Sequence, residues 1–254
     1  FMSSIENIEN IQIKAKFNGA TGNYSAILTA FPNIDWPTYA KKFVEDYLGL
    51  AFNPLTTQIE SHDYTCHILD GIRHFNNVLV DFDVDMWLYI SMEYFKQIPV
   101  KGEVGSSTMP HKVNPIRFEN SEANIDMSNN ICVALSDSSS QRNLGLAVGY
   151  SLQAINETMN GLAKCVVNVD KLASDLNEKV EVLAEPIQTM LRKYGVPDAY
   201  DTLKALTRGK SISKEDILKF AESLDILSDE DRATLVNMTP ASYIGKASEL
   251  ADIK

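Results

Sequence analysis

Residues 64–95 decide the fold class, and their sequence is YTCHILDGIRHFNNVLVDFDVDMWLYISMEYF. Apolar side chains recur here in steps of four and three residues, close to the repeat of an α-helix. Only Gly71 interrupts the pattern, and no proline occurs between Pro54 and Pro99. The spacing predicts one amphipathic helix of about 32 residues, about 48 Å long and far longer than an average globular helix. The apolar stripe consists of Ile68, Ile72, Phe75, Leu79, Phe82, Met86, Tyr89 and Met92.

A second stripe has the same alternation of steps and predicts a second long helix. It consists of Leu144, Val148, Leu152, Ile155, Met159, Leu162, Val166 and Val169. Two such helices side by side favour a bundle, and strand patterns of alternating β-branched residues between tight turns are almost absent. We therefore predict an all-α fold. Both stripes are too extensive for one chain of this size to cover, so we expect a tetramer in which these helices pack against their symmetry mates.

Glycine and proline divide the rest of the chain into shorter helical segments. They are dense in the first 57 residues, which we interpret as a connecting region. From about Asp170 the segments become short again, and Ser213 and Ser228 each precede an acidic residue by three positions, a pattern typical of helix N-caps. We predict a long-helix bundle domain at residues 1–169 and a small helical domain at residues 170–254.

Composition excludes several classes of protein. The chain has 254 residues, with 23 Lys+Arg against 34 Asp+Glu and a net charge of −11. A polyphosphate partner requires a basic surface, so we expect no nucleic-acid binding. No run is long and apolar enough to span a membrane, and we expect a soluble, cytoplasmic protein. Cys66, Cys132 and Cys165 have no metal-site spacing, so we expect three reduced thiols in the core.

The segment between the two long helices holds the residues with chemical potential. Residues 102–115 are GEVGSSTMPHKVNP, bounded by glycine and proline and rich in hydroxyl groups. Gly105 permits unusual backbone torsions, paired serines and backbone N–H groups can surround an anion, and Lys112 adds a positive charge. Considered on composition alone, the segment also fits a surface hairpin between helices.

A resemblance favours the anion site over the hairpin. GSSTMPHKVNP, residues 105–115, resembles the signature loop of the fumarase/aspartase/argininosuccinate lyase superfamily, and the flanking motifs resemble the bacterial type of the adenylosuccinate lyase family. These motifs are NPLTTQIESHDY (53–64), MPHKVNPIRFENSEAN (109–124), RNLGLAVGYSLQA (142–154), VLAEPIQTMLRKYG (182–195), LTRGK (206–210) and MTPASYIGKA (238–247). The resemblance covers nearly the whole chain.

The resemblance implies the superfamily's long-helix bundle and an elimination reaction. The family releases fumarate from adenylosuccinate to leave AMP, and from the succinylated aminoimidazole carboxamide ribotide earlier in purine synthesis. It implies a homotetramer with active sites shared between subunits, a small-molecule substrate, and neither a metal nor a cofactor. A base removes the proton next to a carboxylate, the carbanion is stabilised, and an acid protonates the leaving nitrogen.

The signature loop supplies four of the site residues that the resemblance implies. Ser106 is the base, acting as an alkoxide, and its alternative role is a hydroxyl that merely caps the loop. Ser107, Lys112 and Asn114 bind the substrate, and the last two face its carboxylates. None of the four histidines is our candidate for the acid, because the family's acid lies in an upstream motif.

Four further residues match family positions outside that loop. Gln58 and Asn120 match substrate-binding positions, although either could be a buried amide that bridges two helices. Ser138 and Arg142 match residues that face the nucleotide phosphate, although Arg142 could be a solvated helix residue. We also expect Lys112, Arg142 and Arg117 to form a positive basin within the acidic surface.

The chain departs from the family pattern in two places. The family's N-terminal domain, with the catalytic histidine, is absent, so we expect the chain to be part of a longer enzyme. A segment of about a dozen residues is also lacking at Ala134-Leu135. We expect that segment to exist as a substrate-ordered stretch, with the Ala134 carbonyl carbon many ångströms from the Leu135 nitrogen.

Two other functions compete with this lyase. One is a non-catalytic helical scaffold, which intact Ser106, Lys112 and Asn114 argue against. The other is a sister fumarate-releasing lyase that acts on argininosuccinate, aspartate or malate, which the flanking motifs argue against.

Overall fold

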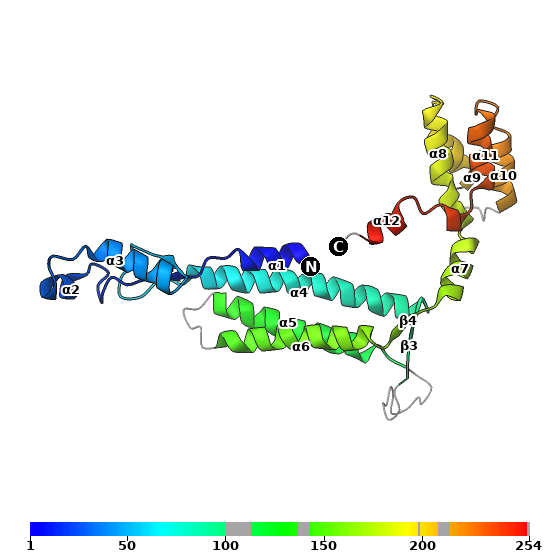
Figure 1. Ribbon diagram of the computed structural model, residues 1–254. Helices are drawn as coiled ribbons and strands as arrows, with labels where there is room; N and C mark the ends of the chain where they lie inside the picture. The colour runs from blue at the N-terminus through cyan, green and yellow to red at the C-terminus, as the bar shows by residue number, and fades with distance from the viewer. Residues whose placement is uncertain (100–112, 137–142, 198, 208–213, 253–254) are drawn as a thin grey trace. The chain divides into compact units, whose positions relative to one another are not determined.

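The computed structural model describes residues 1–99, 113–136, 143–197, 199–207 and 214–252 (Figure 1). Helices dominate, and the described strands have only two or three residues each, so the all-α prediction is confirmed. The chain forms two compact units, Phe1–Val166 and Val167–Lys254. Their boundary lies three residues before the one predicted from the sequence.

Unit 1 is built on three long helices, α4 (Asp63–Ser91), α5 (Ile116–Ser136) and α6 (Leu144–Leu162), which lie side by side in Figure 1. Hydrogen bonds between them fix their directions. Asn76 of α4 bonds Ser128 of α5 at 3.1 Å and accepts from Ser151 of α6 at 2.6 Å. Seven residues further along α4, the carboxylate of Asp83 accepts from Thr158, which also bonds Ser121. Because the α6 numbers rise with those of α4 while the α5 numbers fall, α6 runs parallel to α4 and α5 runs antiparallel.

The first predicted helix is confirmed over most of its length, but it ends at Ser91 and not at Phe95. Glu93 has a positive φ of 62°, which an α-helix does not accept, and the chain turns there. Phe95–Gln97 then forms the short strand β3, which pairs with β4 (Cys165–Val167).

The second predicted helix was extended too far, because α6 ends at Leu162. Its apolar stripe is also not its buried face. Val148, Leu152 and Met159 are 44%, 56% and 60% exposed. The buried face consists of small and polar residues, which let the three helices approach closely: Ala147, Ser151, Ala154, Glu157, Thr158 and Gly161.

The expected separation at Ala134-Leu135 is wrong, because α5 runs unbroken through both residues to Ser136. Leu135 lies three residues after Cys132, so both fall on the same face of the helix. They are buried in one cluster with Leu69 and Ala147. The residues before and after the Ala134-Leu135 bond therefore follow one continuous helical periodicity.

Two glycines mark close contacts of the bundle. A Cβ at Gly71 of α4 would lie 2.6 Å from the Ile8 side chain of α1 (Met2–Glu9), which packs along α4. A Cβ at Gly161 of α6 would lie 2.8 Å from the ring of Phe118, which is fully buried at the start of α5. Gly71 is therefore a contact between helices and not a break in α4.

The segment between α1 and α4 contains short elements. Strand β1 (Lys14–Ala15) pairs in parallel with β2 (Ala51–Phe52), with Lys14 opposite Ala51. Between them lie α2 (Ser25–Ala30), α3 (Trp36–Lys42) and the π-helix η1 (Phe43–Tyr47). The β1–β2 pair positions the loop that leads from Phe52 to α4.

Unit 2 has its own hydrophobic core, which includes Leu183, Ile187, Leu191, Leu203 and Leu235. Ser228 caps α11 by accepting a hydrogen bond from the Asp231 N–H at 3.2 Å, as its spacing predicted. Ser213 lies outside the described residues. The elements are α7 (Val169–Glu178), η3 (Val180–Leu183), α8 (Ala184–Lys193), α9 (Ala199–Thr207), α10 (Lys214–Glu222), α11 (Asp229–Asn237), η4 (Pro240–Ser242) and α12 (Ala247–Ala251).

The three cysteines are free thiols, but only Cys132 is buried, while Cys66 and Cys165 are half-buried. The expectation of three core positions is therefore correct for Cys132 alone. Among the helices that the structure describes, none combines the length and the apolar character needed to cross a membrane.

Candidate functional site

The structure describes three of the eight predicted site residues. Gln58 lies in the loop between β2 and α4, Asn114 lies just before α5, and Asn120 lies on α5. The other five lie outside the described residues: Ser106, Ser107, Lys112, Ser138 and Arg142.

Gln58 belongs to an irregular loop, residues 53–62, in which several side chains are exposed. Gln58 itself is exposed, and its neighbours Leu55 and Ile59 are 88% and 68% exposed. The alternative role of a buried amide between two helices is therefore wrong for Gln58. It is also wrong for Asn120, which is exposed on α5.

The first half of the loop is held by Asn18, whose side chain is fully buried. Its amide nitrogen donates to Thr56 Oγ1 at 2.8 Å, and Thr56 Oγ1 lies 3.0 Å from the amide oxygen. Gly22 lies against the same residue, since a Cβ there would be 1.9 Å from the Thr56 carbonyl oxygen. Gly22 also has a positive φ of 76°, so two independent constraints favour glycine.

The middle of the loop is held by Lys16. Its Nζ donates to the carbonyl oxygens of Thr57 and Gln58, both at 2.7 Å, and to that of Gly19 at 2.8 Å. An ammonium group has three protons, so these three carbonyls use all of them.

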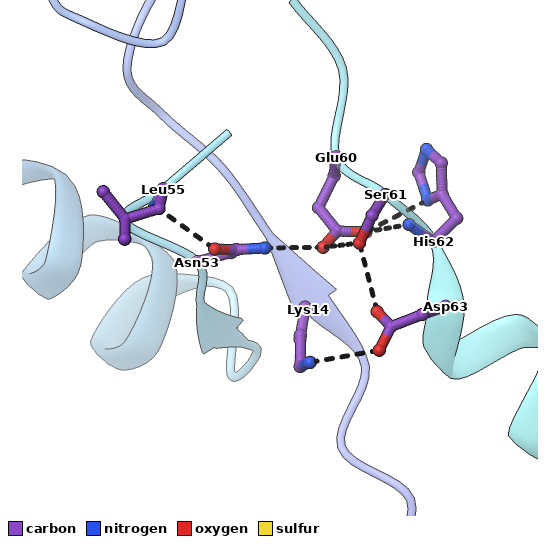
Figure 2. A network of polar contacts seen from close by, with 7 residues as sticks. All are labelled: Lys14, Asn53, Leu55, Glu60, Ser61, His62 and Asp63. Carbon is purple, nitrogen blue, oxygen red and sulfur yellow. Dashed lines mark hydrogen bonds and ion pairs between the residues drawn. The ribbon is translucent and has the colours of Figure 1, made fainter. Parts of the chain in front are cut away.

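The last part of the loop is held by Glu60, which is 4% exposed (Figure 2). Its carboxylate accepts hydrogen bonds from Asn53 Nδ2 at 2.8 Å, from the His62 backbone N–H and from Ser61 Oγ. Burial alone would raise the pKa of Glu60, but these hydrogen bonds outweigh it and lower the pKa. Glu60 is therefore an ionised anchor between the end of β2 and the start of α4.

A second polar contact lies beside this anchor. Ser61 Oγ also bonds the carboxylate of Asp63 at 3.1 Å, and Lys14 Nζ lies 3.6 Å from the same group. The Ser61 hydrogen bond is the main cause of the lowered pKa of Asp63. This pair is solvent-exposed, so it contributes little to the stability of the fold.

Arg117, near the start of α5, faces a carboxylate. Its guanidinium lies 2.9 Å and 3.1 Å from the two oxygens of Glu157 on α6, and Glu157 is 7% exposed. The positive charge of Arg117 is thus balanced within the bundle. This differs from the expected positive basin, to which Arg117 was to contribute.

The described site residues are not brought together within one chain. Gln58 precedes the start of α4, whereas the antiparallel register places Asn114 and Asn120 toward the end of α4 (Figure 1). The 29 residues of α4 span about 43 Å between these ends. A ligand of nucleotide size cannot contact both groups in one protomer.

Two described residues, Ser136 and Val113, are close in the chain to candidates outside the described residues, and they too lie toward opposite ends of α4. Ser136, which precedes Ser138 in the chain, has its carbonyl oxygen 3.8 Å from Cys66 Sγ, one turn into α4. Val113, which follows Lys112, directly precedes Asn114. The described residues Ser136 and Val113 therefore lie toward opposite ends of α4.

The sequence did not single out Lys16, Asn18 or Glu60. Gly19 and Gly22 were interpreted only as breakers, although Gly22 contacts the Gln58 loop directly. The available indication was that Lys16 and Asn18 directly precede this pair of glycines, but their partners lie about 40 residues away in the chain. Within the described ranges, no group of three or more His, Cys, Asp or Glu residues is arranged to hold a metal ion.

Comparison with known proteins places these features in a family. Residues 2–131 match the family model of lyases, and residues 133–244 match the model "Adenylosuccinate lyase C-terminal". The adenylosuccinate lyase of Vibrio cholerae serotype O1 is 47% identical over 258 residues, and those of Haemophilus influenzae and Escherichia coli K12 are 46% identical. Each match covers 96% of this chain but 56% of the relative, so the chain spans little more than half the length of these relatives.

The length of these alignments bears on the segment lacking at Ala134-Leu135. They extend over 258 residues, more than the 254 of the whole chain. The relatives therefore contain residues within the matched span that have no counterpart here.

Solved structures show the same fold at low sequence identity. The 3-carboxy-cis,cis-muconate lactonizing enzyme from Pseudomonas putida matches with a TM-score of 0.61 and 17% identity, over 96% of this chain and 57% of that one. The class II fumarase from Schistosoma mansoni matches with a TM-score of 0.50 and 20% identity, over 77% of this chain and 43% of that one. These two likenesses concern the fold alone. The family models that match residues 2–131 and 133–244, together with the relatives named adenylosuccinate lyase, show that the chain belongs to the adenylosuccinate lyase family.

Proposed function

We propose that the protein is a carbon–nitrogen lyase that releases fumarate from adenylosuccinate to leave AMP. The observation that carries this proposal is the 46–47% identity to relatives named adenylosuccinate lyase over 96% of the chain. The same site would act on the succinylated aminoimidazole carboxamide ribotide, which carries the same leaving fumarate. Both substrates are free nucleotides, and we propose that the enzyme acts on them in the cytoplasm.

In the proposed reaction, Ser106 removes the proton from the carbon next to a substrate carboxylate. The electron pair forms the double bond of fumarate as the C–N bond breaks, and an acid protonates the departing nitrogen. A serine hydroxyl is a weak acid, so it needs positive charge and hydrogen-bond donors close by. Lys112 supplies such a charge, and with Asn114 it binds the carboxylates of the substrate.

The remaining residues of the proposed site bind the nucleotide. Ser138 and Arg142 face its phosphate, where the two-pronged donor geometry of arginine suits phosphate oxygens. Gln58, Ser107 and Asn120 add hydrogen bonds. The exposure of Gln58 and Asn120 supports their part, because an exposed amide is available to a ligand.

We propose further that each active site combines residues from different chains of a homotetramer. Gln58 lies near one end of α4 and Asn114 lies toward the other, and α4 is about 43 Å long, more than a nucleotide can bridge. A partner chain that presents the opposite end of its own bundle supplies the missing set. The exposed apolar stripe of α6, at Val148, Leu152 and Met159, supports such packing between copies.

The experiment that tests the function compares Ser106→Ala with Ser107→Ala in the complete protein. Ser106→Ala should lower kcat by roughly a thousandfold or more with KM nearly unchanged, because a base acts only in the transition state. Ser107→Ala should mainly raise KM, because it removes a ground-state contact. Retention of more than about a tenth of kcat in Ser106→Ala would remove Ser106 from the role of base.

The wild-type protein distinguishes the competing functions in the same assay. Fumarate release from adenylosuccinate supports the proposal. Release from argininosuccinate or aspartate alone would identify a sister lyase, and no release from any of the three would favour a helical scaffold.

A further inference from the structure

We propose that Lys16 is a positioning residue for substrate binding, which fixes the backbone around Gln58 and so orients its side-chain amide. The inference rests on the proposed function, in which Gln58 binds the substrate. It adds a residue that lies 42 positions earlier in the chain and belongs to none of the motifs that indicated the family.

The contacts of Lys16 fall on both peptide groups that flank Gln58. The Thr57 carbonyl belongs to the peptide bond before the Gln58 Cα, and the Gln58 carbonyl belongs to the one after it. Lys16 Nζ bonds both oxygens at 2.7 Å. Because a peptide group is planar, two held planes leave little freedom to the torsions between them, and the direction of the Gln58 Cβ is fixed.

Gln58 depends on such a backbone constraint because its side chain is exposed. An exposed amide has no surrounding side chains to select one orientation. For a binding residue, an orientation that is set before the ligand arrives lowers the entropic cost of binding.

Lys16 is itself held in place. It directly follows β1, and the Asn53 N–H donates to the Ala15 carbonyl at 2.9 Å, which ties the start of the Gln58 loop to the residue before Lys16. The third proton of Lys16 goes to Gly19, within its own turn. The ammonium group is thus fixed from the β1 side and reaches across to the loop.

Removal of Lys16 should free Gln58 without releasing the whole loop. Asn18 still holds Thr56, and Glu60 still holds Asn53. The expected loss is therefore local to Thr57 and Gln58, and it should appear in substrate binding before it appears in folding.

The test measures steady-state kinetics of the complete protein with adenylosuccinate. Lys16→Met keeps the length of the side chain and removes its three donors. We expect KM to rise about 10- to 100-fold, the range for loss of charge-assisted hydrogen bonds, with kcat within about threefold of wild type. Lys14→Met is the matched control, because the contact that Lys14 makes with Asp63 is solvent-exposed, and KM should stay within about twofold.

A double variant shows whether Lys16 acts through Gln58. Gln58→Ala should raise KM, and Lys16→Met added to Gln58→Ala should raise it no further, because the side chain that Lys16 orients is already gone. Lys16→Ala should recover in part on addition of propylammonium, which can place an ammonium group among the three carbonyls. Unchanged KM in Lys16→Met, or fully additive effects in the double variant, would overturn the inference.

Amide hydrogen exchange separates this inference from the proposed function. Peptides that contain residues 56–59 should exchange faster in Lys16→Met than in Lys14→Met, whether or not the protein turns over adenylosuccinate. If exchange is faster in Lys16→Met but the wild-type protein does not turn over adenylosuccinate, the proposed function is contradicted while the hold of Lys16 on the Gln58 backbone is supported. If the wild-type protein turns over adenylosuccinate but Lys16→Met changes neither the exchange nor KM, the proposed function is supported and the role of Lys16 is contradicted.

Discussion

Gly22 and Gly49 have the same type of backbone but different surroundings. Both have a positive φ, 76° and 65°, which disfavours any residue with a Cβ. A Cβ at Gly22 would overlap the Thr56 carbonyl oxygen at 1.9 Å, whereas no atom of the described residues lies within 4 Å of one at Gly49. We expect Gly49→Ala to lower the free energy of unfolding by about 1 kcal/mol, the cost of the torsion. Gly22→Ala should lower it by at least about 2 kcal/mol more, because the loop must also move.

Urea unfolding of the two glycine variants measures this difference. Gly22→Ala should also raise KM for adenylosuccinate, since Thr56 is two residues from Gln58 in the loop. Equal losses of stability in the two variants would contradict the close contact at Gly22.

Asp83 is a buried carboxyl group whose titration opposes folding. It is fully buried on α4, and its Oδ1 accepts from Thr158 at 2.8 Å. Its Oδ2 has no hydrogen-bond partner among the residues that the structure describes. Burial raises the pKa of Asp83, and hydrogen bonds from Ser121 and Thr158 only partly oppose this shift. Glu122, whose pKa is raised by burial and by Asp83, adds negative charge nearby.

The raised pKa gives the direction of the pH dependence. The folded state keeps its proton at pH values where the unfolded chain has lost it, so stability falls as pH rises from the unfolded pKa through the folded one. Asp83→Asn removes this loss, and we expect a gain on the order of 1 kcal/mol in the free energy of unfolding at pH 8 that shrinks toward pH 4. Asp81→Asn, on the exposed side of the same helix, is the control and should change stability by less than about 0.5 kcal/mol. A variant of Asp83 that is less stable than wild type at pH 8 would show that the carboxylate is needed in its charged form.

At the scale of the helices, two glycines of α6 test the packing of the bundle. A Cβ at Gly161 would lie 2.8–3.1 Å from three atoms of the Phe118 ring, while in the described parts of the chain no atom lies within 4 Å of one at Gly149. Gly149→Ala should raise the free energy of unfolding by about 0.5–1 kcal/mol, because alanine favours a helix. Gly161→Ala should lower it by about 1–3 kcal/mol, because the ring must shift in a packed core. Thermal unfolding of both variants checks the opposite signs, and two changes of the same sign would contradict the contact.

The sequence predicted the long helices but not which of their faces is buried. Periodicity located α4 and α6 because each has a regular apolar stripe. We expected the stripe of α6 to pack against another copy, and within one chain Leu152 is exposed while Ala147 and Ala154, outside the stripe, are buried. A stripe shows only that a face avoids water, and contact with another helix or another chain gives the same pattern. The helix ends were missed because they depend on single torsions, such as the positive φ of Glu93.

The sequence predicted candidate binding residues but not the residues that hold them in place. Gln58 and Asn120 were predicted because they stand in motifs that resemble a family, and the structure shows only that both are exposed. Lys16 and Glu60 were missed. Lys16 acts on backbone carbonyls, which any residue provides, so its partners at Thr57 and Gln58 leave no pattern in the sequence.

At the scale of the whole molecule, packing between copies of the chain would explain both the exposed apolar stripe of α6 and the separation of Gln58 from Asn114. The apolar stripe of α6 is exposed, with Leu152 at 56% and Met159 at 60%. Gln58 and Asn114 are separated along α4, a helix about 43 Å long. Packing of α6 against another copy would cover the stripe, and an antiparallel copy would bring the opposite end of its bundle to each Gln58.

This arrangement predicts that two weakly active variants restore activity to each other. Gln58→Ala and Asn114→Ala should each have little activity at a substrate concentration near the wild-type KM, because each raises KM, but a mixed oligomer contains sites that take Gln58 from one variant and Asn114 from the other. Random assembly of equal amounts gives both native residues at about a quarter of the sites, so activity should recover to at most about a quarter of wild type. Lys112→Ala mixed with Asn114→Ala is the control: these residues lie two positions apart, come from the same chain, and should give no recovery. Sedimentation must show mixed tetramers in both samples, and equal recovery in the two mixtures, or none in either, would contradict a site shared between chains.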